Sequence, residues 1–101
     1  MWFRIQYPHL VLFAVPNGGK RNTKEAAILK AEGVLAGVAD LFLMCPSRDY
    51  SGLFIEMKYG VGKQTDNQIT FQANAEKAGY RYEVASSIEE FIQVVNNYLK
   101  Q

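Results

Sequence analysis

The segment 52–60, GLFIEMKYG, limits the possible folds more than any other part of the chain, because it reads as a buried strand that carries two opposite charges. Side chains alternate between the two faces of a strand, so Glu56 and Lys58 lie on one face together with Phe54. Both faces are otherwise apolar. Charges on such a strand are costly unless they are exposed in a cleft and used there.

The composition predicts one domain over residues 1–101, because 101 residues with 49% hydrophobic content can build one core and not two. A net charge of +1 excludes a generally basic nucleic-acid binder, so any basic surface must come from local clusters. The single Cys45 leaves no internal disulfide and fits a reducing compartment. We find no membrane span and no secretory signal, so we expect a cytoplasmic protein.

Periodicity and capping signals alternate between helix and strand along the chain. NTKE at 22–25 and SSIEE at 86–90 have the form of capping boxes, and TDNQ at 65–68 offers Thr65 or Asp66 as an N-cap. The predicted fold is an α/β domain in which helices flank a small mixed β-sheet. The expected strands are 10–15, 40–45, 52–60 and 80–85, and the expected helices are 22–33, 65–79 and 86–99.

Two of these helices have an apolar stripe that we expect to face the sheet. In helix 65–79 the stripe includes one polar residue, Gln68, whereas Gln64 and Gln72 are expected at the surface. The remaining stripe residues are Phe71, Ala75 and Ala78 in helix 65–79, and Ile88, Phe91, Ile92, Val95 and Leu99 in helix 86–99.

The strands 40–45 and 52–60 are joined by PSRDYSG, which predicts a β-hairpin. If residue 45 faces residue 53, Asp40 lies opposite Lys58 and diagonal to Glu56. Two carboxylates suit a hard cation such as Mg²⁺, which can stabilise a phosphodiester and activate water, while Lys58 orients that water. The alternative is an ordinary cross-strand ion pair of Glu56 and Lys58 on a solvated face, with Asp40 capping the turn after Gly37.

The loop at 17–21 precedes the first long helix and contains two glycines and two cations. Exposed N–H groups and cations before a helix N-terminus suit a phosphate backbone, although the loop could also be a simple turn. The candidate DNA-binding residues are Asn17, Gly18, Gly19, Lys20 and Arg21.

Five segments together are similar to a known family. AVPNGGKRN, KAEGVLAGVADLFL, GLFIEMK, Gln68 and AGYRYEVASS resemble, in order and spacing, the virus-type replication-repair nuclease (VRR-NUC) domain, a branch of the PD-(D/E)xK nucleases. The resemblance covers nearly all of residues 8–99 and implies a restriction-endonuclease-like core. It implies Mg²⁺ or Mn²⁺ held by Asp40, Glu56 and the Met57 backbone carbonyl, with Lys58 and Gln68 completing the catalytic set.

The resemblance also implies partners. Stand-alone members from phages and bacteria resemble homodimeric, structure-selective nucleases that act on branched DNA such as the Holliday junction. This chain departs from the family pattern in two places: Ala39 replaces the usual Pro, and no acidic residue precedes Glu25, where family members commonly carry a helix with a further acid. The alternatives are therefore a catalytically incomplete DNA-binding module of the same fold and an assembly subunit without affinity for nucleic acid.

Overall fold

The sheet is mixed, as the sequence predicts. The computed structural model describes residues 2–16, 32–60 and 62–100. Its four strands follow the order β1-β2-β3-β4 within one sheet. The pairs β1–β2 and β2–β3 are antiparallel, and the pair β3–β4 is parallel. The strands are β1 (Leu12–Ala14), β2 (Leu41–Leu43), β3 (Leu53–Met57) and β4 (Arg81–Ala85).

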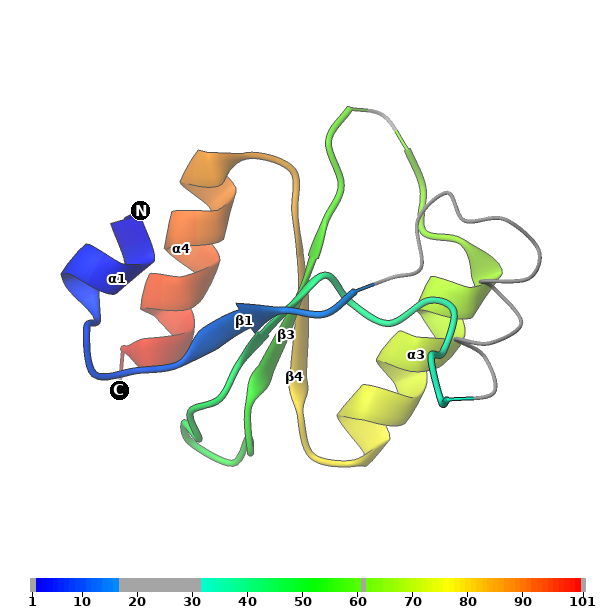
Figure 1. Ribbon diagram of the computed structural model, residues 1–101, viewed down its shortest axis with the longest axis horizontal. Coiled ribbons are helices and arrows are strands. Elements are labelled where there is room, and N and C mark those ends of the chain that lie inside the picture. The colour runs from blue at the N-terminus through cyan, green and yellow to red at the C-terminus, as the bar shows by residue number, and fades with distance from the viewer. Residues whose placement is uncertain (1, 17–31, 61, 101) are drawn as a thin grey trace.

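Helices cover both faces of this sheet. Helix α3 (Asp66–Lys77) connects β3 to β4 and lies on one side, while α4 (Ile88–Leu99) and the short α1 (Trp2–Gln6) lie on the other (Figure 1). A helix between two parallel neighbouring strands is the connection that such strands require. The predicted helix at 22–33 lies outside the described residues except for its last two positions.

Helix α1 has no counterpart among the helices expected from the sequence. Five residues are too few to be stable by propensity alone, so tertiary contacts must hold α1 in place. The Trp2 ring packs edge-on against Phe91 of α4, and the Tyr7 hydroxyl donates a hydrogen bond to Asn96 Oδ1 at 2.6 Å. The N-terminus is thereby joined to α4.

The two faces of the sheet have different packing. The face toward α4 carries an aliphatic core whose largest fully buried side chains are Leu43, Leu53, Ile55 and Val95. The face toward α3 is aromatic: Phe54 contacts the rings of Phe42, Phe71 and Tyr80. Since Phe54 faces α3, alternation along β3 directs Glu56 to the same side.

Both helix caps follow the sequence signals. Thr65 Oγ1 accepts from the Gln68 N–H at 3.2 Å, and Gln68 Oε1 accepts from the Thr65 N–H at 2.8 Å, so α3 begins with a complete capping box. Ser87 Oγ accepts from the Glu90 N–H at 3.1 Å at the start of α4.

Two expected inward residues point elsewhere. Ile88 is 57% exposed, because it occupies the first position of α4, and Tyr98 is buried on that helix instead. Ala78, at the C-cap of α3, is also exposed.

The predicted hairpin register is wrong by two residues. Leu43 pairs with Leu53, and Leu41 pairs with Ile55. The reason is a longer connection: β2 ends at Leu43, and the chain then forms a tight turn closed by the isolated pair Ser47 and Tyr50. A shift by two keeps each side chain on its predicted face. Continued by one residue, the observed register sets Asp40 opposite Glu56 and not opposite Lys58.

Candidate active site

Asp40 and Glu56 meet where β2 begins and β3 approaches its end. Asp40 immediately precedes β2, and its Oδ2 accepts the Met57 backbone N–H at 2.8 Å. That bond holds the Asp40 carboxylate against β3, one residue from Glu56. Asp40 is therefore fastened to the neighbouring strand.

Glu56 is an almost fully buried carboxyl group, with only 4% of its surface exposed. Oε2 accepts a hydrogen bond from Gln68 Nε2 at 3.1 Å. Oε1 has no hydrogen-bond partner among the described residues. The pKa of Glu56 is raised from 4.5 to about 7: burial raises it most, the charge and the hydrogen bond of Asp40 raise it as well, and the charge of Lys58 opposes the increase.

The neighbouring carboxyl groups of Asp40 and Glu56 require a compensating proton or cation. Both are acceptors when ionised, so their close approach is favourable only with a shared proton or with a cation between them. Mg²⁺ and Mn²⁺ prefer oxygen ligands, and Mg²⁺ is commonly held by one or two carboxylates with substrate and water completing its shell. The unpaired Oε1 and the neighbouring Asp40 thus fit a divalent cation.

Lys58 lies beside this pair without joining it. It is half-buried, its charge lowers the Glu56 pKa, and its backbone N–H donates to Ala85 O at 2.8 Å. The ion pair that the structure records among its described residues joins Arg81 and Glu83, and Lys58 has none there. The solvated Glu56–Lys58 ion pair, considered above as an alternative, is therefore wrong.

Met57 contributes to the site through its backbone. Its side chain points to the opposite face and packs against the aliphatic core. Its N–H is already used by Asp40 Oδ2. The role of its carbonyl oxygen as a metal ligand stays a prediction.

The predicted surface position of Gln64 and Gln72 is wrong. Both are half-buried, and Gln64 Nε2 donates to Gln72 Oε1 at 3.1 Å and to the Tyr82 hydroxyl at 3.3 Å. Tyr82 is 4% exposed, and burial raises the pKa of its hydroxyl. The signal for these contacts in the sequence is the spacing of four between Gln64, Gln68 and Gln72. This spacing places Gln68 and Gln72 on one side of α3, and Gln64 lies just before the helix.

The candidate DNA-binding residues, Asn17 to Arg21, lie outside the described residues. Within 2–16, 32–60 and 62–100, no group of three His, Cys, Asp or Glu side chains could hold a metal ion. The described helix α1 carries no acid and lies on the α4 side of the sheet, away from Glu56.

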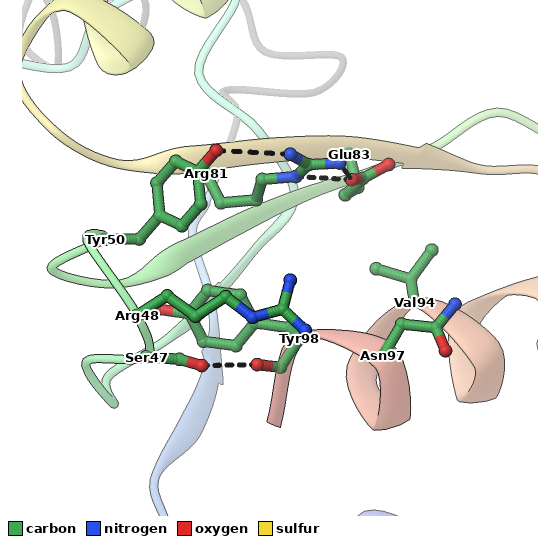
Figure 2. Close-up of a pocket in the computed structure, with 8 residues that line it drawn as sticks. All are labelled: Ser47, Arg48, Tyr50, Arg81, Glu83, Val94, Asn97 and Tyr98. Atoms are coloured by element: carbon green, nitrogen blue, oxygen red, sulfur yellow. Dashed lines mark hydrogen bonds and ion pairs between the residues drawn. The ribbon is translucent and has the colours of Figure 1, made fainter. Parts of the chain in front are cut away.

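A pocket of about 150 Å³ lies on the α4 side, between the turn after β2, strand β4 and α4 (Figure 2). Its polar groups bond to one another. Arg81 reaches the Tyr50 hydroxyl at 3.2 Å and pairs with Glu83, and Arg48 Nη2 donates to Lys100 O at 3.0 Å. This network fastens the turn to β4 and α4, and it is separated from Glu56 by the sheet.

Three comparisons with known proteins bear on this arrangement. A sequence model of the VRR-NUC domain family matches residues 7–89. A solved structure described as a VRR_NUC domain protein is similar with a TM-score of 0.77 and 33% sequence identity, over 88% of this chain and 67% of that chain. No curated protein matches the chain. In the described residues, no helix is long and apolar enough to cross a membrane.

Proposed function

This chain belongs to the VRR-NUC family, a family of nucleases with the PD-(D/E)xK-like fold, and we propose that it is a divalent-metal-dependent DNA endonuclease. The observation that carries the proposal is the buried Glu56, which has one unpaired oxygen and lies beside Asp40. A buried carboxyl oxygen without a hydrogen-bond partner costs stability unless a ligand completes it.

Asp40, Glu56 and the Met57 carbonyl would hold Mg²⁺ or Mn²⁺. When bound, such an ion stabilises charge on a phosphodiester and lowers the pKa of a water. The protein's own contribution is to fix the ligands: the Met57 N–H holds Asp40, and the Gln68 amide holds Glu56 Oε2 and leaves Oε1 open. Hydrogen bonds that orient ligands in this way set the affinity of a metal site.

Lys58 supplies a positive charge that forms no ion pair among the described residues. It lies two residues after Glu56, at the end of β3, and its backbone is fastened to β4. An ammonium in this position can orient the attacking water or offset negative charge that develops on the phosphate. We therefore assign Lys58 to the reacting phosphate and not to the metal.

The proposed contacts with DNA include residues other than the metal ligands. Asn17, Gly18, Gly19, Lys20 and Arg21 form the phosphate-binding loop of this proposal, on the basis of their sequence alone. Action on branched DNA and assembly as a homodimer are proposed from the resemblance to the family. Cation contacts with phosphates make binding fall steeply as salt rises.

A DNA-binding module without cleavage is the second candidate. It is favoured by one observation: the described residues contain no third His, Cys, Asp or Glu side chain that could hold a metal ion together with Asp40 and Glu56. Such a module would bind DNA with or without a divalent cation, whereas the nuclease requires the cation to cut.

Cleavage of labelled linear duplex, flap and four-way junction DNA in Mg²⁺, Mn²⁺ or chelator tests the proposal. The wild type and two variants are compared: Glu56→Gln removes a metal ligand, and Glu83→Gln is a matched control because Glu83 lies on β4 and faces α4. We expect metal-dependent cutting by the wild type and by Glu83→Gln, and at least a ~100-fold loss in Glu56→Gln, in line with the several kcal/mol that a catalytic metal supplies. Salt-sensitive binding without cutting in any metal would establish the binding module instead.

A further inference from the structure

Tyr59 differs from every other aromatic residue of the chain. The sequence contains one Trp, six Tyr and six Phe, and all of them lie in the described residues. Among the described residues, every aromatic side chain except Tyr59 contacts another ring. Tyr59 is 65% exposed. Its ring does not contribute to the core.

Tyr59 lies close to the carboxylate pair. It follows Lys58 directly and is three residues from Glu56, so an extended chain places its Cα at most ~11 Å from that of Glu56. Gly60, with φ +81, turns the chain immediately after it, in the segment that leads from β3 to α3 (Figure 1). Two cations, Lys58 and Lys63, flank Tyr59 in the sequence.

Tyr59 is the most exposed aromatic side chain of the described residues. Single exposed apolar residues are common on protein surfaces and need no ligand. Ile5 and Ile88 are examples, and so is Val84, which pairs with Glu56 in the sheet. Tyr59 differs from these three because it carries an exposed aromatic ring, directly after Lys58 and three residues after Glu56.

We propose that Tyr59 stacks on an unpaired base near the bond that is cut, and so favours substrates with single-stranded nucleotides. This inference rests on the proposed function. A nucleic-acid strand advances ~3.4 Å per nucleotide, so the Cα atoms of Tyr59 and Glu56 are at most about three nucleotides apart. Aromatic side chains bind unpaired bases by stacking, independently of sequence, and cations beside them hold the backbone. Bases inside an intact duplex are already stacked, so Tyr59 distinguishes branch points, flaps and loops from continuous duplex.

Fluorescence anisotropy of a labelled ~16-nucleotide single strand and of a duplex of the same length tests the inference. Both are titrated in chelator, so that binding is measured without cleavage. Tyr59→Ala is compared with Tyr59→Phe, which keeps the ring, and with Ile5→Ala, an exposed residue on the other side of the sheet. Thermal unfolding of each variant verifies that it is folded.

We expect Tyr59→Ala to lose affinity for the single strand and to keep its affinity for the duplex. Tyr59→Ala should weaken single-strand binding by about fivefold to 150-fold, and Tyr59→Phe and Ile5→Ala should stay within about threefold of the wild type. Duplex binding should change by less than about threefold in all variants. Equal losses on single strand and duplex, or an unchanged single-strand affinity in Tyr59→Ala, overturn the inference.

A parallel cleavage reaction of the wild type in Mg²⁺ separates this inference from the proposed function. If the wild type cuts DNA and Tyr59→Ala keeps its single-strand affinity, the inference alone fails. If the wild type does not cut, the proposed nuclease fails, and the binding comparison still decides the role of Tyr59.

Discussion

Glu56 has a different environment at each of its two oxygens. Oε2 is held by Gln68, whereas Oε1 has no hydrogen-bond partner among the described residues and Asp40 is next to the group. Without a metal, the carboxyl group is favoured in its protonated form, because burial and a like charge oppose ionisation. A divalent cation reverses this preference. Glu56 therefore links the stability of the protein, its pH dependence and its proposed activity.

The metal-free protein should lose stability as the pH rises from about 4.5 to about 7. The Glu56 pKa is raised from 4.5 to about 7 on folding, so between these values the folded state binds more protons than the unfolded state. The free energy of unfolding then decreases with rising pH, by at most about 3 kcal/mol for this group. Urea unfolding in chelator across this range measures the effect.

Glu56→Gln supplies the control for that pH dependence. The amide cannot ionise, so the contribution of Glu56 to the slope should vanish, and the metal-free variant should be more stable than the wild type at pH 7.5. An equal pH slope in the wild type and in the variant would show that Glu56 is not the group responsible.

At the level of single residues, alternation along β3 was sufficient to place Glu56 on the same side as Phe54, toward α3. It could not show that Gln64 donates to both Gln72 and the buried Tyr82, because a polar residue at the edge of a helix reads as a surface residue. Nor did it single out Tyr59, because its lack of a ring partner depends on where all the other rings lie.

The first turn of α3 has two linked roles, one in the stability of the helix and one in the position of Glu56. Gln68 closes the capping box with Thr65 through Oε1 and holds Glu56 through Nε2. The same side chain therefore stabilises the helix end and orients a proposed metal ligand. A substitution that weakens the cap should therefore also affect the orientation of Glu56 beside Asp40.

Thr65→Ala should cost about 1 kcal/mol of stability, as the loss of an N-cap does. It should also slow cleavage by at least about tenfold, because the Gln68 backbone N–H loses its acceptor, Thr65 Oγ1, at the helix end that positions the Gln68 amide against Glu56. Ser87→Ala is the matched control: it removes the N-cap of α4, on the other face of the sheet, and should lower stability similarly without changing the rate. Thermal unfolding and cleavage rates are measured side by side. Equal effects of both variants on the rate would refute the coupling.

The segment before β2 is packed tightly against the first turn of α3. A Cβ on Gly37 would lie 2.4 Å from the backbone carbon of Asn67, and Gly37 has φ +88. Gly79, after α3, also has a left-handed φ of +97, but a Cβ there meets nothing within 4 Å.

Gly37→Ala should therefore destabilise the protein by more than Gly79→Ala. The latter carries only the backbone strain of about 1 kcal/mol, and the former adds a clash that must move α3 or the chain before Asp40. Chemical denaturation of both variants gives the comparison. Similar losses would mean that the approach of α3 to Gly37 is not rigid.

Elements with strong local signals were predicted well, and elements held by tertiary contacts were not. The capping box of α3 and the strands β3 and β4 follow from residues within each element. Helix α1 depends on the contact of Trp2 with Phe91, far away in the sequence. The register of β2 and β3 depends on the turn closed by Ser47 and Tyr50, whose conformation the residue types alone do not specify.

On the scale of the whole molecule, one face of the sheet supports the core and the other face carries the candidate active site. Its α4 side holds the aliphatic core and the network around Arg81, and its α3 side holds the carboxylates, Gln68 and an aromatic layer. Figure 1 shows α3 and α4 on opposite sides of the sheet. The order of motifs along the chain predicted this family and fold, because motif spacing reflects the connections between strands. It could not supply a third metal ligand, and the described residues contain no side chain in that role.

Isothermal titration of Mn²⁺ into the metal-free protein measures directly whether Asp40 and Glu56 form a cation site. The wild type and the Glu83→Gln control should bind Mn²⁺ with the same affinity. Asp40→Asn and Glu56→Gln should each weaken binding by more than about tenfold, since each removes a charged oxygen ligand. Mn²⁺ binding that is unchanged in both ligand variants would contradict a metal-dependent nuclease centred on these two carboxylates.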